Sequence, residues 1–138
     1  MKLGLFLTTL MGLGMALAVS QSVVSQDSRA SVSTEDAAAY DAAFQETLRK
    51  PADPPTLVNF AGIAVKVGDL EGAISALERL LLIDGDNPEV QLELGVLYFR
   101  LGSLEGAKSY LEAASKSRRS SAETKSRADT FLKEASRP

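Results

Sequence analysis

Few side chains in this 138-residue sequence could carry out chemistry on a substrate. Cys, His and Trp are absent, which excludes the usual zinc sites, thiol nucleophiles, disulfides and histidine acid–base catalysis. The sequence shows no Gly-rich phosphate loop, no carboxylate pair in a plausible pocket and no nucleophile beside a base. We therefore expect no enzymatic activity, no cofactor and no metal ion.

One pattern of side chains is suited to binding rather than to chemistry. Leu92, Val96 and Phe99 are spaced i, i+4, i+7, which places them on one side of a helix, away from the side that carries Leu94 and Tyr98. A second apolar stripe of this kind indicates a site for a helix or an extended peptide. Alternatively, Leu92 and Phe99 pack on a neighbouring helix.

An internal repeat supplies the elements that hold this stripe. The segment 68–78 recurs at 102–112 with eight of eleven residues identical, an offset of 34 residues. Pro54 and Pro88 are separated by the same offset. Self-similarity at this period is typical of stacked helical repeats.

Each unit has the sequence features of two helices with defined ends. Asp53 and Asn87 can each accept a hydrogen bond from an early helical N–H, and a proline follows each at the first helical position. Gly68 and Gly102 can end the first helix, because glycine adopts the left-handed conformation without strain. The second helix of each unit begins with a capping residue, Asp69 or Ser103.

Apolar side chains recur at helical spacing within these units, which predicts that they are buried. In the first helix of unit two, the stripe consists of Leu94, Leu97, Tyr98 and Leu101. In the second helices, the stripes consist of Ala73, Leu77, Leu80 and Leu81, and of Ala107, Leu111 and Ala114.

One further helix is expected on each side of the two units. Ser33 or Thr34 can cap a helix over residues 35–49, whose stripe consists of Tyr40, Phe44 and Leu48. Ser120 and Glu123 have the spacing of a capping box. The helix that follows them carries Ala128, Phe131, Leu132 and Ala135 on one face. Such a helix would cover the last apolar face, as the ends of repeat arrays require.

These features resemble the tetratricopeptide repeat. The 34-residue period, Leu94 followed by Gly95, Tyr98, Ala107 and the apolar Leu111 match the pattern of that family, and the first unit matches it less closely. The resemblance implies an all-α fold, a short right-handed superhelix of stacked helix-turn-helix repeats. The expected domain covers 35–136, with a degenerate half repeat at 35–50, repeats at 54–87 and 88–121, and a capping helix at 121–136.

The resemblance also implies a concave face lined by the first helix of each repeat. By the usual geometry of the family, the side chains facing this groove are Val58, Gly62, Val65, Lys66, Glu89, Leu92, Val96, Phe99 and Arg100. Lys66 and Arg100 lie one repeat apart and could hold a carboxylate. The resemblance thus predicts a non-catalytic module that binds another protein or a peptide.

A weaker resemblance is to the N-terminal repeat region of Gram-negative envelope proteins similar to surface lipoprotein assembly modifiers. It rests on the runs 42–48, 68–81 and 92–103. In those proteins an outer-membrane β-barrel follows the repeats, and no barrel strands follow here. Two alternatives to a simple binding module are therefore a membrane-tethered envelope assembly factor and the remnant repeat region of a protein that once carried a barrel.

The first residues have the features of an export signal. Lys2 precedes an apolar run over residues 3–19, and Ala16 and Ala18 offer the small residues that a signal peptidase recognises. The sequence predicts a signal peptide at 1–20 and a flexible linker at 21–34. We expect export to the periplasm or cell envelope of a Gram-negative bacterium, with an uncleaved membrane anchor as the alternative.

Charge and composition narrow the partners. Net charge is only −3, which does not favour nucleic acid, and 45% apolar residues are enough for a packed core. Contact with a membrane is expected only if the N-terminal segment stays uncleaved. A homodimer through the open edge of the repeats is a further alternative.

Overall fold

The computed structural model describes residues 32–137, which form six α-helices. In chain order they are α1 (Thr34–Arg49), α2 (Pro54–Val67), α3 (Leu70–Ile83), α4 (Pro88–Arg100), α5 (Leu104–Lys116) and α6 (Ala122–Ala135). The predicted all-α class is confirmed. The predicted signal peptide and nearly all of the predicted linker lie outside the described residues. None of the helices in the described part is long and apolar enough to cross a membrane.

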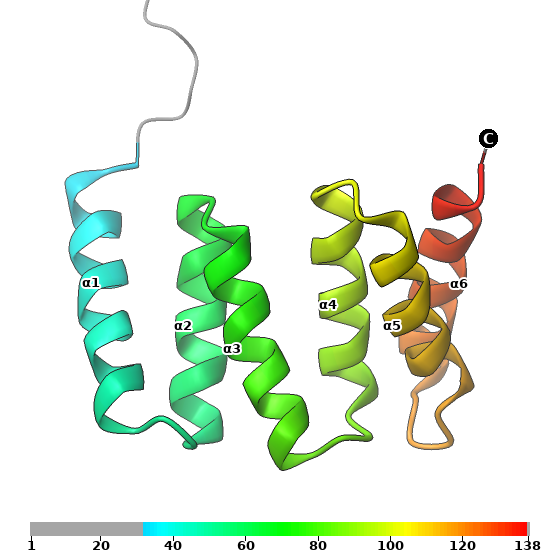
Figure 1. The fold of residues 1–138 in the computed structure, drawn as a ribbon, viewed down its shortest axis with the longest axis horizontal. Coiled ribbons are helices and arrows are strands. Elements are labelled where there is room, and N and C mark those ends of the chain that lie inside the picture. The colour runs from blue at the N-terminus through cyan, green and yellow to red at the C-terminus, as the bar shows by residue number, and fades with distance from the viewer. Residues whose placement is uncertain (1–31, 138) are drawn as a thin grey trace, which may run out of the picture. The chain divides into compact units, whose positions relative to one another are not determined.

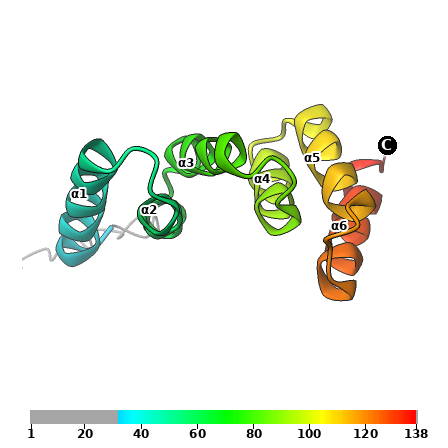
Figure 2. The same ribbon diagram turned by 90° about the horizontal axis from the view of Figure 1, so that it is seen from below.

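The helices pack in sequential pairs, and each runs opposite to the one before it (Figure 1). α2 packs against α3, and α4 against α5, while α1 packs on α2 and α6 contacts both α4 and α5. Viewed from below, α2, α4 and α6 lie along one side and α3 and α5 along the other (Figure 2). The first helices of the two units therefore lie on the same side, as the predicted groove requires.

Local side-chain contacts explain where the helices begin and end. Four capping side chains accept a hydrogen bond from the backbone N–H three residues later, at 3.0 to 3.1 Å: Ser33, Asp53, Asp69 and Asn87. Gly68 and Gly102 have φ of 88° and 75°, the left-handed region that favours glycine. These predicted helix ends are confirmed.

Two predicted caps differ in the structure. Ser103 precedes α5 but makes no capping hydrogen bond, although its φ and ψ of −83° and 76° nearly equal the −81° and 78° of Asp69. On the same backbone, the carboxylate reaches the helix and the shorter hydroxyl does not. The cap of α6 is Ser121 rather than Ser120, since the Ser121 Oγ accepts from the Thr124 N–H at 3.0 Å. The Ser120 hydroxyl instead donates to a carbonyl in the last turn of α5.

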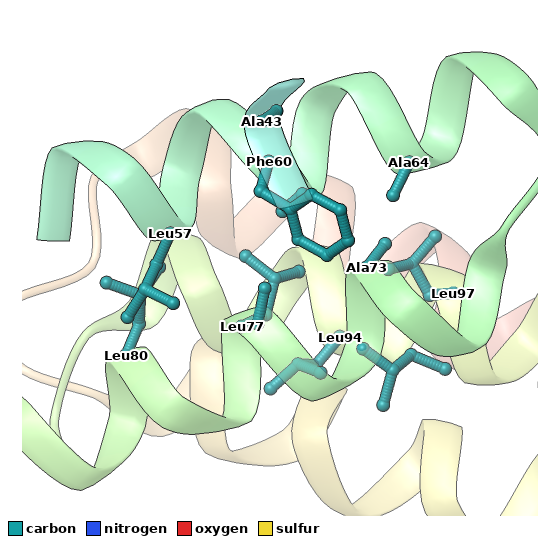
Figure 3. Close-up of a cluster of buried hydrophobic side chains, with 12 residues drawn as sticks. Ala43, Leu57, Phe60, Ala64, Ala73, Leu77, Leu80, Leu94 and Leu97 are labelled. Carbon is teal, nitrogen blue, oxygen red and sulfur yellow. The ribbon is translucent and has the colours of Figure 1, made fainter. Parts of the chain in front are cut away.

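The buried apolar side chains form two neighbouring cores. The first joins α1 to α4 through residues that include Leu57, Phe60 and Leu94 (Figure 3). The second joins α4, α5 and α6, and Leu111 lies at its centre with no exposed surface. Nearly all of the stripes predicted for the second helices are buried, with Leu81 partly so. Repeat pairs are thus held to each other by side chains and not by single elements.

Three side chains that were predicted to be buried are exposed instead. Phe44 and Leu48 are 41% and 61% exposed, and α1 buries Ala43 and Thr47 in their place. Among the described helices α1 packs only on α2, so a single narrow face of it is covered. Leu101 is 42% exposed because it follows the last residue of α4, where the chain turns away from the core.

Tyrosine–carboxylate hydrogen bonds join successive helices. The Tyr40 hydroxyl donates to the Asp69 carboxylate at 2.6 Å, and the Tyr98 hydroxyl donates to the Glu78 carboxylate at 2.8 Å. The ring of Tyr110 stacks on that of Tyr98 with centroids 5.5 Å apart. The hydrogen bonds, with burial, raise the pKa of Tyr40 and of Tyr98 to about 12. Burial, with the nearby Glu78, raises the pKa of Tyr110.

We expect stability to fall as the pH rises from about 10 toward 12. An unfolded tyrosine ionises near pH 10, whereas the folded phenols keep their protons, so the stabilisation is complete below pH 10 and is lost above it. Urea unfolding at pH 9 and pH 11 measures the loss, and Tyr98→Phe should reduce it. Absorbance at 295 nm should show native phenolates forming above pH 10. Native phenolates that form at the same pH as unfolded ones would contradict this account.

Candidate functional site

The part of the predicted groove that belongs to the first repeat is open. Val58 is 56% exposed, Gly62 is exposed and Val65 is partly exposed along one side of α2. All three border a hollow of about 210 Å³ between α2 and α4. Its full lining is Val58, Ala61, Gly62, Val65, Leu77, Glu93 and Leu97. The structure therefore brings three of the predicted site residues together around one apolar space.

Gly62 has no internal packing role that accounts for a glycine in the middle of a helix. A Cβ added there would meet no atom within 4 Å. By contrast, a Cβ at Gly95 would lie 2.5 Å from the Cγ atom of Leu111. Glycine inside a helix costs up to about 1 kcal/mol relative to alanine. At Gly62 that cost is matched only by the space it leaves in the hollow.

The part of the predicted groove that belongs to the second repeat is covered. Leu92 is only 1% exposed, and Val96 and Phe99 pack with it against α5 and α6. The rings of Phe99 and Phe131 meet edge-on with centroids 5.8 Å apart. This corrects the expectation that Leu92, Val96 and Phe99 face an open groove. The alternative of packing on a neighbouring helix holds, because α6 lies on this side of α4.

The charged residues predicted for the groove have separate environments. The Lys66 ammonium pairs with Asp36 on α1, and this hydrogen bond is the main reason why the pKa of Asp36 is lowered. Glu89 accepts a long hydrogen bond of 3.4 Å from the Thr124 hydroxyl on α6. Arg100 is exposed near the end of α4, and no ion pair holds it within residues 32–137. Lys66 and Arg100 are therefore not an equivalent pair in this structure.

Four residues that line the hollow were missed by the sequence reasoning: Ala61, Leu77, Glu93 and Leu97. Leu77 and Leu97 belong to the predicted buried stripes, and the hollow exposes only an edge of each. Glu93 carries the single charge of the lining, and its carboxylate pairs with Arg127 of α6 at 3.1 Å. The signal for Glu93 was available, since it lies one turn from Glu89 on the same helix.

A larger hollow of about 430 Å³ lies between α3 and α5 and is lined by Ser75, Glu78, Arg79, Leu81, Leu82 and Tyr110. Its main polar groups are already bonded within the chain. Glu78 accepts from two tyrosines, and the Arg79 guanidinium donates to the carbonyl of Pro51. None of the predicted site residues borders it. The smaller, more apolar hollow is therefore the better candidate.

A comparison with protein families decides what the helix pairs are. The profile described as tetratricopeptide repeat matches residues 64–126, which cover most of α3 to α5 with the flanking turns. Residues 64–126 are a tetratricopeptide-repeat region. Domains of this family typically bind other proteins, and stacked repeats use one extended face to do so.

The tetratricopeptide profile is the family match found, and no catalytic family matches the chain. No curated protein matches it significantly in sequence. The weaker resemblance to surface lipoprotein assembly modifiers is not supported. Within residues 32–137, no three Asp or Glu side chains cluster in a way that could hold a metal ion.

Proposed function

We propose that this protein is a non-catalytic interaction module that takes a segment of another polypeptide into the hollow between α2 and α4. The observation that carries the proposal is an apolar lining left uncovered on the face that tetratricopeptide domains use. Val58, at 56% exposed, is more accessible than a side chain of the core would be. An occupant of the hollow would remove this apolar surface from water.

We also propose that the module acts in the periplasm or cell envelope of a Gram-negative bacterium. The support for this location is the sequence of the first twenty residues, where Lys2 precedes a long apolar run and small residues at Ala16 and Ala18. On this proposal the helices act in the envelope after the signal peptide has been removed.

A crosslinked pull-down of the tagged protein from the envelope fraction tests the function. Gly62→Phe places a phenyl ring in the hollow, and Ser75→Phe places the same ring in the larger hollow between α3 and α5. We expect Gly62→Phe to reduce recovery of a partner by at least about tenfold, since about 1.4 kcal/mol of lost contact suffices. Ser75→Phe should leave recovery unchanged.

Circular dichroism and urea unfolding would first show that both variants fold. Equal recovery with the wild-type protein and with Gly62→Phe would contradict the proposed site. A partner lost only with Ser75→Phe would move the site to the α3–α5 hollow.

A further inference from the structure

The internal repeat shows why the hollow between α2 and α4 exists. Shifting by 34 residues converts Val58, Gly62 and Val65 of α2 into Leu92, Val96 and Phe99 of α4. The same shift converts Leu97 of α4 into Phe131 of α6.

Every one of these residues is smaller in the first repeat than its equivalent in the second. Together the four side chains lack about eleven carbon atoms, which a close-packed interior would register as empty space.

The helices respond to this difference in size. α4 and α6 approach each other closely, whereas among the described helices no Cα atom of α2 lies within 8 Å of one in α4. At the second junction, Phe99 and Phe131 fill the space between neighbouring helices. At the first junction, the equivalent Val65 and Leu97 stand on the lining of an open hollow. The missing volume is that of an aromatic side chain.

We propose that the hollow takes a phenylalanine-sized side chain presented by an amphipathic helix of the partner, with a basic residue one turn before it. This inference rests on the proposed function and specifies its ligand. A cavity of about 150 Å³ lined by apolar residues is known to accept benzene, so about 210 Å³ accommodates a phenyl ring. Gly62 lets the backbone of the occupant approach α2 closely.

Helix α6 shows within the same chain what such an occupant looks like. It packs on α4 with Phe131 against Phe99, and with Arg127, one turn earlier, paired to Glu93 at 3.1 Å. Glu93 also borders the hollow on its other side. A carboxylate accepts several hydrogen bonds, so Glu93 can bind a second cation there. The charge at the rim therefore favours a basic residue on the partner beside its aromatic one.

Three labelled helical peptides of about 14 residues test this inference. Each carries Arg one turn before a variable position that holds Phe, Leu or Ala. Fluorescence anisotropy measures their binding to the chain without residues 1–20 and to its Gly62→Phe variant. We expect affinity to decrease from Phe to Leu to Ala, with at least about a tenfold difference between Phe and Ala, because burial of the ring contributes most of the contact. Gly62→Phe should abolish the preference for Phe.

Equal affinity of the Phe and Ala peptides, or no binding of any peptide, would overturn the inferred ligand. The pull-down with Gly62→Phe then decides the proposed function separately. A partner that depends on the hollow but presents no large apolar side chain would leave the function standing without this ligand. Glu93→Gln should weaken the Arg-containing peptides and leave peptides with Gln at that position unchanged.

Discussion

Gly95→Ala is expected to lower the free energy of unfolding by about 2 kcal/mol, the usual cost of overpacking a filled core. Alanine normally favours a helix over glycine, so the sign comes from packing alone. A Cβ at this position would lie 2.5 Å from Cγ and 2.7 Å from Cδ2 of Leu111. Leu111 has no exposed surface and no free space into which it could rotate. Urea unfolding measures the change.

Gly62→Ala is the matched control, because Gly62 also lies within the first helix of a repeat. A Cβ there meets nothing within 4 Å, so this variant should be more stable by about 0.5 to 1 kcal/mol. Opposite signs at the two glycines would support the packing described. Shifts of the same sign would contradict the close approach of α4 to α5.

Leu111→Ala is expected to lower the free energy of unfolding by about 3 kcal/mol. Leu111 is fully buried between α4, α5 and α6, and removal of its side chain leaves a cavity in the second core. Thermal or urea unfolding measures this loss, which is a large share of the roughly 5 to 15 kcal/mol that stabilises a typical domain. Leu82→Ala, at a leucine that is 87% exposed, is the control and should change stability little.

The double variant Gly95→Ala, Leu111→Ala separates contact from coincidence. If the two side chains compete for one space, the alanine methyl group at position 95 fills part of the cavity at position 111. The double variant should then be more stable than the sum of the two single changes predicts. Strict additivity would show that residues 95 and 111 do not share that space.

The sequence was sufficient to predict the helices because their ends depend on local chemistry. Asp53 and Asn87 cap through neighbouring N–H groups, and Gly68 turns the chain through its own φ. The 34-residue period then predicted the pairing of helices. Capping was less certain where two serines compete, as at Ser120 and Ser121, since both can reach the same turn.

The candidate site was only partly predictable, since the sequence pattern cannot give the distance between repeats. Val58 and Leu92 are equivalent in the repeat, yet one is largely exposed and the other is buried. The difference depends on whether the next first helix approaches, which the sizes of several distant side chains determine together. Glu93 was missed for the same reason, because it borders the hollow only in the folded arrangement of α2, α3 and α4.

The most direct test of the central claim is site-specific photo-crosslinking in the bacterium that makes this protein. A photoreactive phenylalanine analogue at position 58 would lie at the hollow between α2 and α4, and one at position 82 would lie at the hollow between α3 and α5. The account predicts that position 58 crosslinks to another polypeptide, identified by mass spectrometry, and that position 82 does not. Crosslinks from position 82 alone, or none from position 58, would contradict it.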